Sequence, residues 1–71
     1  MIVVSGEEVV RALLRAGFAR VSQKGSHRKM RHPDGRVAIV PMHAELTVGT
    51  LKSVLRQAGL TEDELRSLLK R

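Results

Sequence analysis

Two tight-turn signals in the middle of the chain restrict its fold most strongly. Gly25-Ser26 has glycine first, as a two-residue type II′ hairpin turn requires. His32-Pro33-Asp34-Gly35 has proline and glycine where a type I turn places them. The residues around these turns predict strands over Phe18 to Lys24, His27 to His32 and Arg36 to Pro41. Short strands joined in this way predict a three-stranded antiparallel meander.

Helix-start and helix-stop signals flank this middle segment. Ser5 with Glu8, and Thr61 with Glu64, have the spacing of capping boxes, and Gly59 is suited to end a helix. Three apolar stripes at helical spacing accompany these signals: Val9, Val10, Leu13 and Leu14; Leu51, Val54, Leu55 and Ala58; and Leu65, Leu68 and Leu69. The predicted order is therefore α-β-β-β-α-α, an α+β fold whose helices cover one face of the sheet.

Length and composition limit the possible functions. The 71 residues are enough for one domain, over residues 1–71, with one small core. The chain has no cysteine, which excludes disulfides and thiolate metal sites and agrees with a reducing compartment. The apolar runs are too short to span a membrane, and Met1 to Val4 lacks the basic region of a signal peptide. We expect a cytoplasmic protein with no membrane partner and no cofactor.

The charge of the chain is concentrated in its middle. The formal net charge is +6, and five of the seven acidic residues fall where helices are predicted to begin, where they offset the helix dipole. Between Arg20 and Arg36 lie six cations and one acid, Asp34. Such a surface attracts nucleic acid or an acidic protein, although a basic face can also serve only to keep a protein solvated.

The second predicted strand combines an imidazole with several of these cations. Because side chains alternate along a strand, His27, Lys29 and Arg31 share the open face if Met30 points toward the helices. Histidine transfers protons near neutral pH, and lysine or arginine can hold a phosphate. RNA supplies its own nucleophile, the 2′-hydroxyl, whereas DNA does not. The residues thus predict metal-independent RNA cleavage that leaves a cyclic phosphate.

We assign His27 as the candidate catalytic residue. The candidates for contact with RNA or phosphate are Lys24, Gly25, Ser26, Arg28, Lys29 and Arg31. Of these, Lys24, Lys29 and Arg31 are favoured as phosphate-holding groups, while Ser26 serves mainly the geometry of the turn.

Other kinds of site fit the residues less well. The three histidines, His27, His32 and His43, do not predict a metal site. His27 and His32 are five residues apart and therefore face opposite ways on a regular strand, and no carboxylate cluster accompanies them. A Ser26-His27 nucleophile pair lacks an orienting acid, and the single aromatic residue, Phe18, provides no stacking platform for bases. Two alternatives stay open: a non-catalytic RNA-binding module of the same fold and a basic protein-interaction module.

Nearly the whole chain resembles the HicA toxins. The resemblance is carried, in order and spacing, by Ser5-Gly6-Glu7-Glu8-Val9, Ala16-Gly17-Phe18, Gly25-Ser26-His27, Val40-Pro41-Met42-His43, Gly49-Thr50-Leu51 and Val54-Leu55-Arg56-Gln57-Ala58-Gly59-Leu60. It implies a fold like that of double-stranded-RNA-binding domains, with a short additional C-terminal helix. It also implies an mRNA interferase of a toxin–antitoxin pair, inhibited by a HicB antitoxin that covers the active surface. Contact with DNA is then expected only indirectly, through the antitoxin complex.

The family's catalytic histidine falls on His27. The family often has a second histidine immediately afterwards, where this chain has Arg28. The group that protonates the leaving 5′-oxygen therefore stays open. His27 can shuttle both protons, or Lys24 or Lys29 can assist electrostatically.

Overall fold

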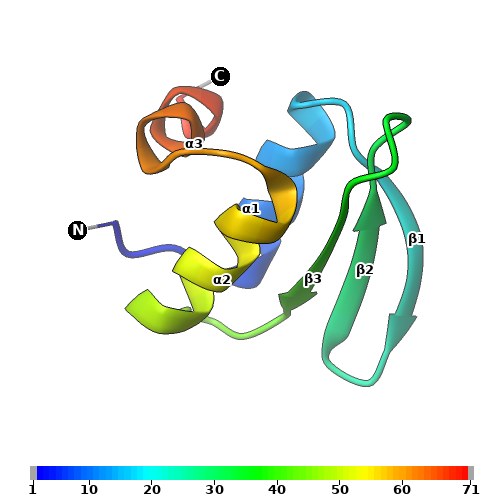
Figure 1. Cartoon of the computed structure of the whole chain (residues 1–71). Helices are drawn as coiled ribbons and strands as arrows, with labels where there is room; N and C mark the ends of the chain where they lie inside the picture. Colours follow the sequence, from blue (N-terminus) through cyan, green and yellow to red (C-terminus); the bar gives the residue numbers. More distant parts are fainter. Residues whose placement is uncertain (1, 71) are drawn as a thin grey trace.

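The computed structural model describes residues 2–70, which form three helices and three strands in the predicted α-β-β-β-α-α order. The elements are α1 (Gly6–Arg15), β1 (Ala19–Lys24), β2 (His27–Arg31), β3 (Val37–Pro41), α2 (Val48–Ala58) and α3 (Glu62–Leu69). Figure 1 shows the helices gathered on one side of the sheet. The predicted α+β architecture is thus confirmed.

The helices begin at the capping residues that the sequence indicates. The Glu8 N–H donates to the Ser5 hydroxyl (3.1 Å), and the Ser5 N–H donates to the Glu8 carboxylate (2.9 Å). Thr61 and Glu64 form the same reciprocal pair, with distances of 3.1 and 2.8 Å. Each box satisfies N–H groups that have no partner within the helix, so it stabilises the first turn.

The strands pair in the order β1-β2-β3, and both pairs are antiparallel. Gly25 has φ +59°, and no non-glycine residue among residues 2–70 has a positive φ, so Ser26 does not. A positive φ at the first central residue alone is the pattern of a type II′ turn. In the second turn, the Gly35 N–H donates to the His32 carbonyl oxygen over 2.9 Å, as in a type I turn.

Each strand is one residue shorter than predicted, and the reason is clearest at Phe18. Its N–H donates to the Leu13 carbonyl (2.9 Å) and the Gly17 N–H donates to the Leu14 carbonyl (3.1 Å), which together form a Schellman motif. Phe18 therefore completes the end of α1 instead of starting β1. Its ring is buried and belongs to the core.

The core lies between the helices and the inner face of the sheet. Its buried apolar side chains come from every helix, from β2 and β3, and from the connections: Val4, Val9, Val10, Ala12, Leu13, Phe18, Met30, Ala38, Val40, Leu46, Leu51, Val54, Leu55, Ala58, Leu65 and Leu68. All six residues of β1 are exposed. In Figure 1 the Gly25-Ser26 end of the β1–β2 hairpin extends away from the helices. The hairpin end is therefore accessible to a large partner.

The short apolar runs of the sequence predict that no segment crosses a membrane. Within the described residues, no helix combines the length and the apolar character needed to cross a bilayer.

Candidate nucleic-acid interface

His27 is the first residue of the central strand and is flanked on both sides. Its Cα partners are Lys24 on β1 and Pro41 on β3, and its side chain is exposed. The type II′ turn places His27 opposite Lys24, because only the two turn residues separate them in the chain. The imidazole thus lies at the accessible end of the hairpin, with a lysine on the neighbouring strand.

The burial pattern of β2 assigns the two faces of the sheet. Met30 is fully buried against the helices, and its partner on β3 is the buried Ala38. His27, Lys29 and Arg31 therefore share the opposite, open face. A register shift lies between Arg20 and Ser22 on β1, and β2 itself pairs without interruption with β3. The open face is the one that the sequence pattern predicts for His27, Lys29 and Arg31.

The open face carries cations without a compensating acid. Lys24 is the Cα partner of His27, and Ser22 is the partner of Lys29. The whole hairpin, Ala19 to Arg31, contains five cations and no acidic residue. Among residues 2–70 the ion pairs involve other side chains, those of His32, Arg36 and Arg66. The positive field around His27 is therefore not neutralised by the hairpin's own residues.

Arg28 lies on the other face and is already engaged. Its guanidinium donates through Nε to the Gln23 side-chain oxygen over 2.9 Å, and also through a terminal nitrogen to the same oxygen. The Gln23 amide nitrogen donates in turn to the Gly25 carbonyl (3.1 Å). Gln23 therefore ties Arg28 to the turn. No sequence motif singles out Gln23, and only the pairing register reveals it.

The two residues of the turn have different roles. A Cβ on Gly25 would meet no atom within 4 Å in the described part of the chain, so the glycine is required by its positive φ and not by crowding. The Ser26 carbonyl accepts a hydrogen bond from the Met42 N–H (2.6 Å). Ser26 thus fixes the turn against the segment after β3 through its backbone.

His32 and Arg36 serve structure beyond the far end of β2. The His32 ring meets Phe18 edge-on, with centroids 5.2 Å apart, and its Nδ1 accepts from the Asp34 N–H (3.1 Å). Arg36 lies over Phe18, pairs with Asp34 (2.8 Å) and donates to the Ala58 carbonyl. The hydrogen bond from the Arg36 N–H is the main cause that lowers the pKa of Asp34. His32 follows the end of β2 that is opposite His27, so it is not part of the same site.

His27, His32 and His43 are the residues that could suggest a metal site. No group of three or more histidine, aspartate or glutamate side chains among residues 2–70 is arranged to hold a metal ion. Along β2 the open face combines the His27 imidazole with lysine and arginine, which is a set that binds anions.

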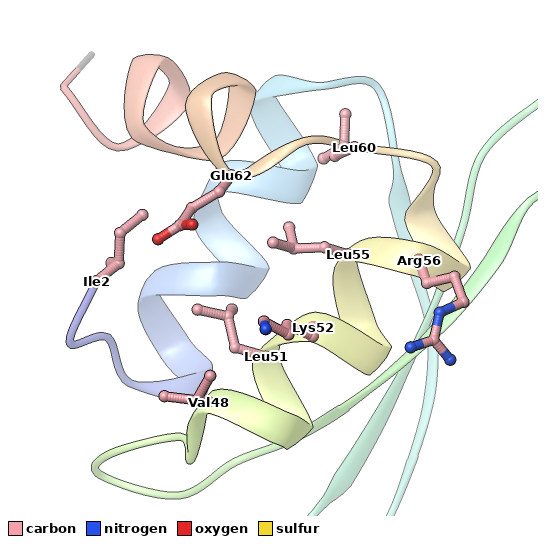
Figure 2. A pocket seen from close by; sticks show the side chains of 8 residues that line it. All are labelled: Ile2, Val48, Leu51, Lys52, Leu55, Arg56, Leu60 and Glu62. Carbon is pink, nitrogen blue, oxygen red and sulfur yellow. The ribbon is translucent and has the colours of Figure 1, made fainter.

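A large hollow on the helical side is separate from this surface. A groove of about 630 Å³ is lined mainly by Ile2, Val48, Leu51, Leu55 and Leu60. Figure 2 shows these side chains around the space between α2, the start of α3 and the N-terminal segment. None of its lining residues comes from the hairpin, and they include no histidine. Proton transfer at a phosphate is therefore better supported on the open sheet face.

Comparisons with known proteins identify the family. No curated protein matches the chain. The family model described as HicA toxin of bacterial toxin–antitoxin matches residues 6–60, which include the hairpin, β3 and α2. The chain therefore belongs to the HicA toxins, a family of toxins from bacterial toxin–antitoxin pairs, and this membership implies an antitoxin partner.

Proposed function

We propose that this toxin is a metal-independent endoribonuclease that cleaves mRNA, with His27 as general acid/base. The observation that carries the proposal is the exposed His27 imidazole on a sheet face that it shares with Lys24, Lys29 and Arg31. Membership of the HicA toxins supports a nuclease role at the level of the family.

The chemistry requires a phosphate to be held next to the imidazole. Lys24, Lys29 and Arg31 bind the RNA backbone, since their charges are not paired with acids of the hairpin. The His27 ring takes the proton of the 2′-hydroxyl as its oxygen bonds to phosphorus. The bond from phosphorus to the 5′-oxygen breaks, and the departing oxygen takes up a proton. The same cations stabilise the charge that grows on the phosphoryl oxygens. The product ends are a 2′,3′-cyclic phosphate and a 5′-hydroxyl.

The antitoxin partner is a HicB-type protein that binds the open face. This face is exposed and basic, so an acidic surface on the antitoxin would be attracted to it and would exclude RNA. Inhibition then follows from occupation of the same residues that hold the substrate.

The test is expression of wild type and His27→Ala in a host that lacks the antitoxin. We expect wild type to deplete mRNA and His27→Ala to lose about 10²–10⁴-fold of the cleavage rate, the usual contribution of a general acid/base. His32→Gln is the matched histidine control, because His32 lies at the other end of β2. Addition of EDTA to the purified protein checks the independence of metal.

The outcomes separate the three possible functions. Equal mRNA loss from wild type and His27→Ala would remove the catalytic assignment. Unchanged mRNA with wild-type protein that still binds RNA would indicate a non-catalytic RNA-binding module. Unchanged mRNA without RNA binding would indicate a protein-interaction module.

A further inference from the structure

β3 ends at Pro41, but one further hydrogen bond and the direction of two carbonyl groups keep the next two residues extended. The Met42 N–H donates to the Ser26 carbonyl oxygen (2.6 Å), which extends the β2–β3 ladder past Pro41. The carbonyl oxygens of Pro41 and His43 both face the start of α1. The first is the nearest atom to a Cβ built on Gly6, and the second accepts the Gly6 N–H over 2.9 Å. Carbonyls two residues apart that point the same way are typical of extended backbone.

The burial of the side chains also indicates that the backbone stays extended after Pro41. Val40 is fully buried, and Met42 is partly buried against the core, so both belong to the helix-covered face. Pro41 and His43 alternate with them and belong to the open face. Pro41 is the Cα partner of His27. His43 is therefore two residues beyond the partner of His27, the diagonal position, which in a regular antiparallel pair corresponds to a Cα separation of about 7–8 Å.

His43 is also available for chemistry. Its side chain is exposed, and within residues 2–70 its ring takes part in none of the side-chain hydrogen bonds or ion pairs. His32, by contrast, has its Nδ1 within 3.0 Å of the Asp34 carboxylate. The backbone of His43 is held by Gly6 while its imidazole is not engaged.

We propose that His43 is the second proton-transfer group of the cleavage reaction, a role that rests on the proposed ribonuclease function. As the 2′-oxygen bonds to phosphorus, His27 takes its proton and the bond from phosphorus to the 5′-oxygen breaks. The imidazolium of His43 gives its proton to that departing oxygen. In an in-line displacement the two oxygens lie on opposite sides of phosphorus, so two imidazoles on neighbouring strands serve them better than one.

The role predicts a dependence on the leaving group. The experiment uses an RNA oligonucleotide that wild type cuts at a single site, made with either oxygen or sulfur at the bridging 5′ position. A thiolate leaves without protonation, so it needs no general acid. We expect His43→Ala to cut the oxygen substrate about 10²–10⁴-fold more slowly than wild type and the sulfur substrate at close to the wild-type rate. His27→Ala should be slow on both substrates.

Two further variants keep this test independent of folding. His43→Gln retains a polar side chain of similar length and should show the same selective loss, and His32→Gln should show none. Wild-type rates from His43→Ala on both substrates would overturn the proposal. An equal loss on both substrates would also overturn it, because that indicates a structural or binding role. If His27→Ala instead cuts like wild type, the ribonuclease assignment itself fails.

Discussion

Gly6 and Pro41 are in direct backbone contact at the base of the proposed site. A Cβ atom on Gly6 would collide with the Pro41 carbonyl oxygen and would lie 2.9 Å from the Met42 Cα. Such distances are too short for any side chain, so only glycine allows the start of α1 to approach the end of β3. Pro41 in turn pairs with His27. The first residue of the chain's first helix therefore helps to position the central histidine.

Gly6→Ala is expected to destabilise the protein. The added methyl group meets backbone atoms and not a flexible side chain, so we expect a loss of about 1–3 kcal/mol in the free energy of unfolding, as for other overpacked sites. Gly49→Ala is the matched control, because it lies in the first turn of α2 with no atom of the described chain within 4 Å of the new Cβ. Urea unfolding of both variants decides the matter. A Gly6→Ala protein with the same urea midpoint as wild type would contradict the close contact between Gly6 and Pro41.

Gly25→Ala should weaken the hairpin for a different reason. Here the new Cβ has space, but φ is +59°, where an L-residue other than glycine loses roughly 1–2 kcal/mol. Ser26→Ala is the comparison, and its effect on the free energy of unfolding should stay within about 0.5 kcal/mol. Urea unfolding measures both variants. A Gly25→Ala protein as stable as wild type would argue against the type II′ turn.

The parts of the fold that depend on local interactions are readable from the sequence. The capping boxes at Ser5 and Thr61, the turn at Gly25 and the helix end at Gly59 each involve residues only a few positions apart. Their residue preferences follow from backbone sterics and unpaired N–H groups, which do not need the tertiary structure. This is why the order of the elements and the place of His27 could be predicted.

Contacts between distant segments could not be predicted in this way. Gln57 on α2 accepts the Ile39 N–H (2.8 Å) and so protects the outer edge of β3. Arg15 donates to the Leu68 carbonyl at the end of α3 (2.7 Å). Glutamine and arginine have many possible partners, so their type indicates none of these pairings. The extended backbone through Met42 likewise depends on its bond to Ser26, which only the folded register shows.

The turn at Asp34 predicts a pH dependence of stability. The pKa of Asp34 is lowered mainly by the hydrogen bond from the Arg36 N–H, so its charged form is favoured in the folded state. The contribution is fully present above the unfolded pKa and is lost as the pH falls through the folded pKa. The difference in urea midpoint between wild type and Asp34→Asn should therefore narrow on acidification. Glu45→Gln, an exposed acid outside this turn, is the control. A constant difference between wild type and Asp34→Asn would exclude the linkage.

Neutralising Lys29 or its neighbour Arg28 should affect RNA binding unequally. Lys29 lies on the open face with His27, whereas Arg28 lies on the other face and is bound to Gln23. In a His27→Ala background, which prevents cleavage, Lys29→Gln should reduce the slope of log affinity against log salt by about 0.7, the value for one phosphate contact on a single strand. Arg28→Gln removes the same charge and should change the slope less. A larger effect at Arg28 would place the RNA on the opposite face of the sheet and would refute the site derived from the register.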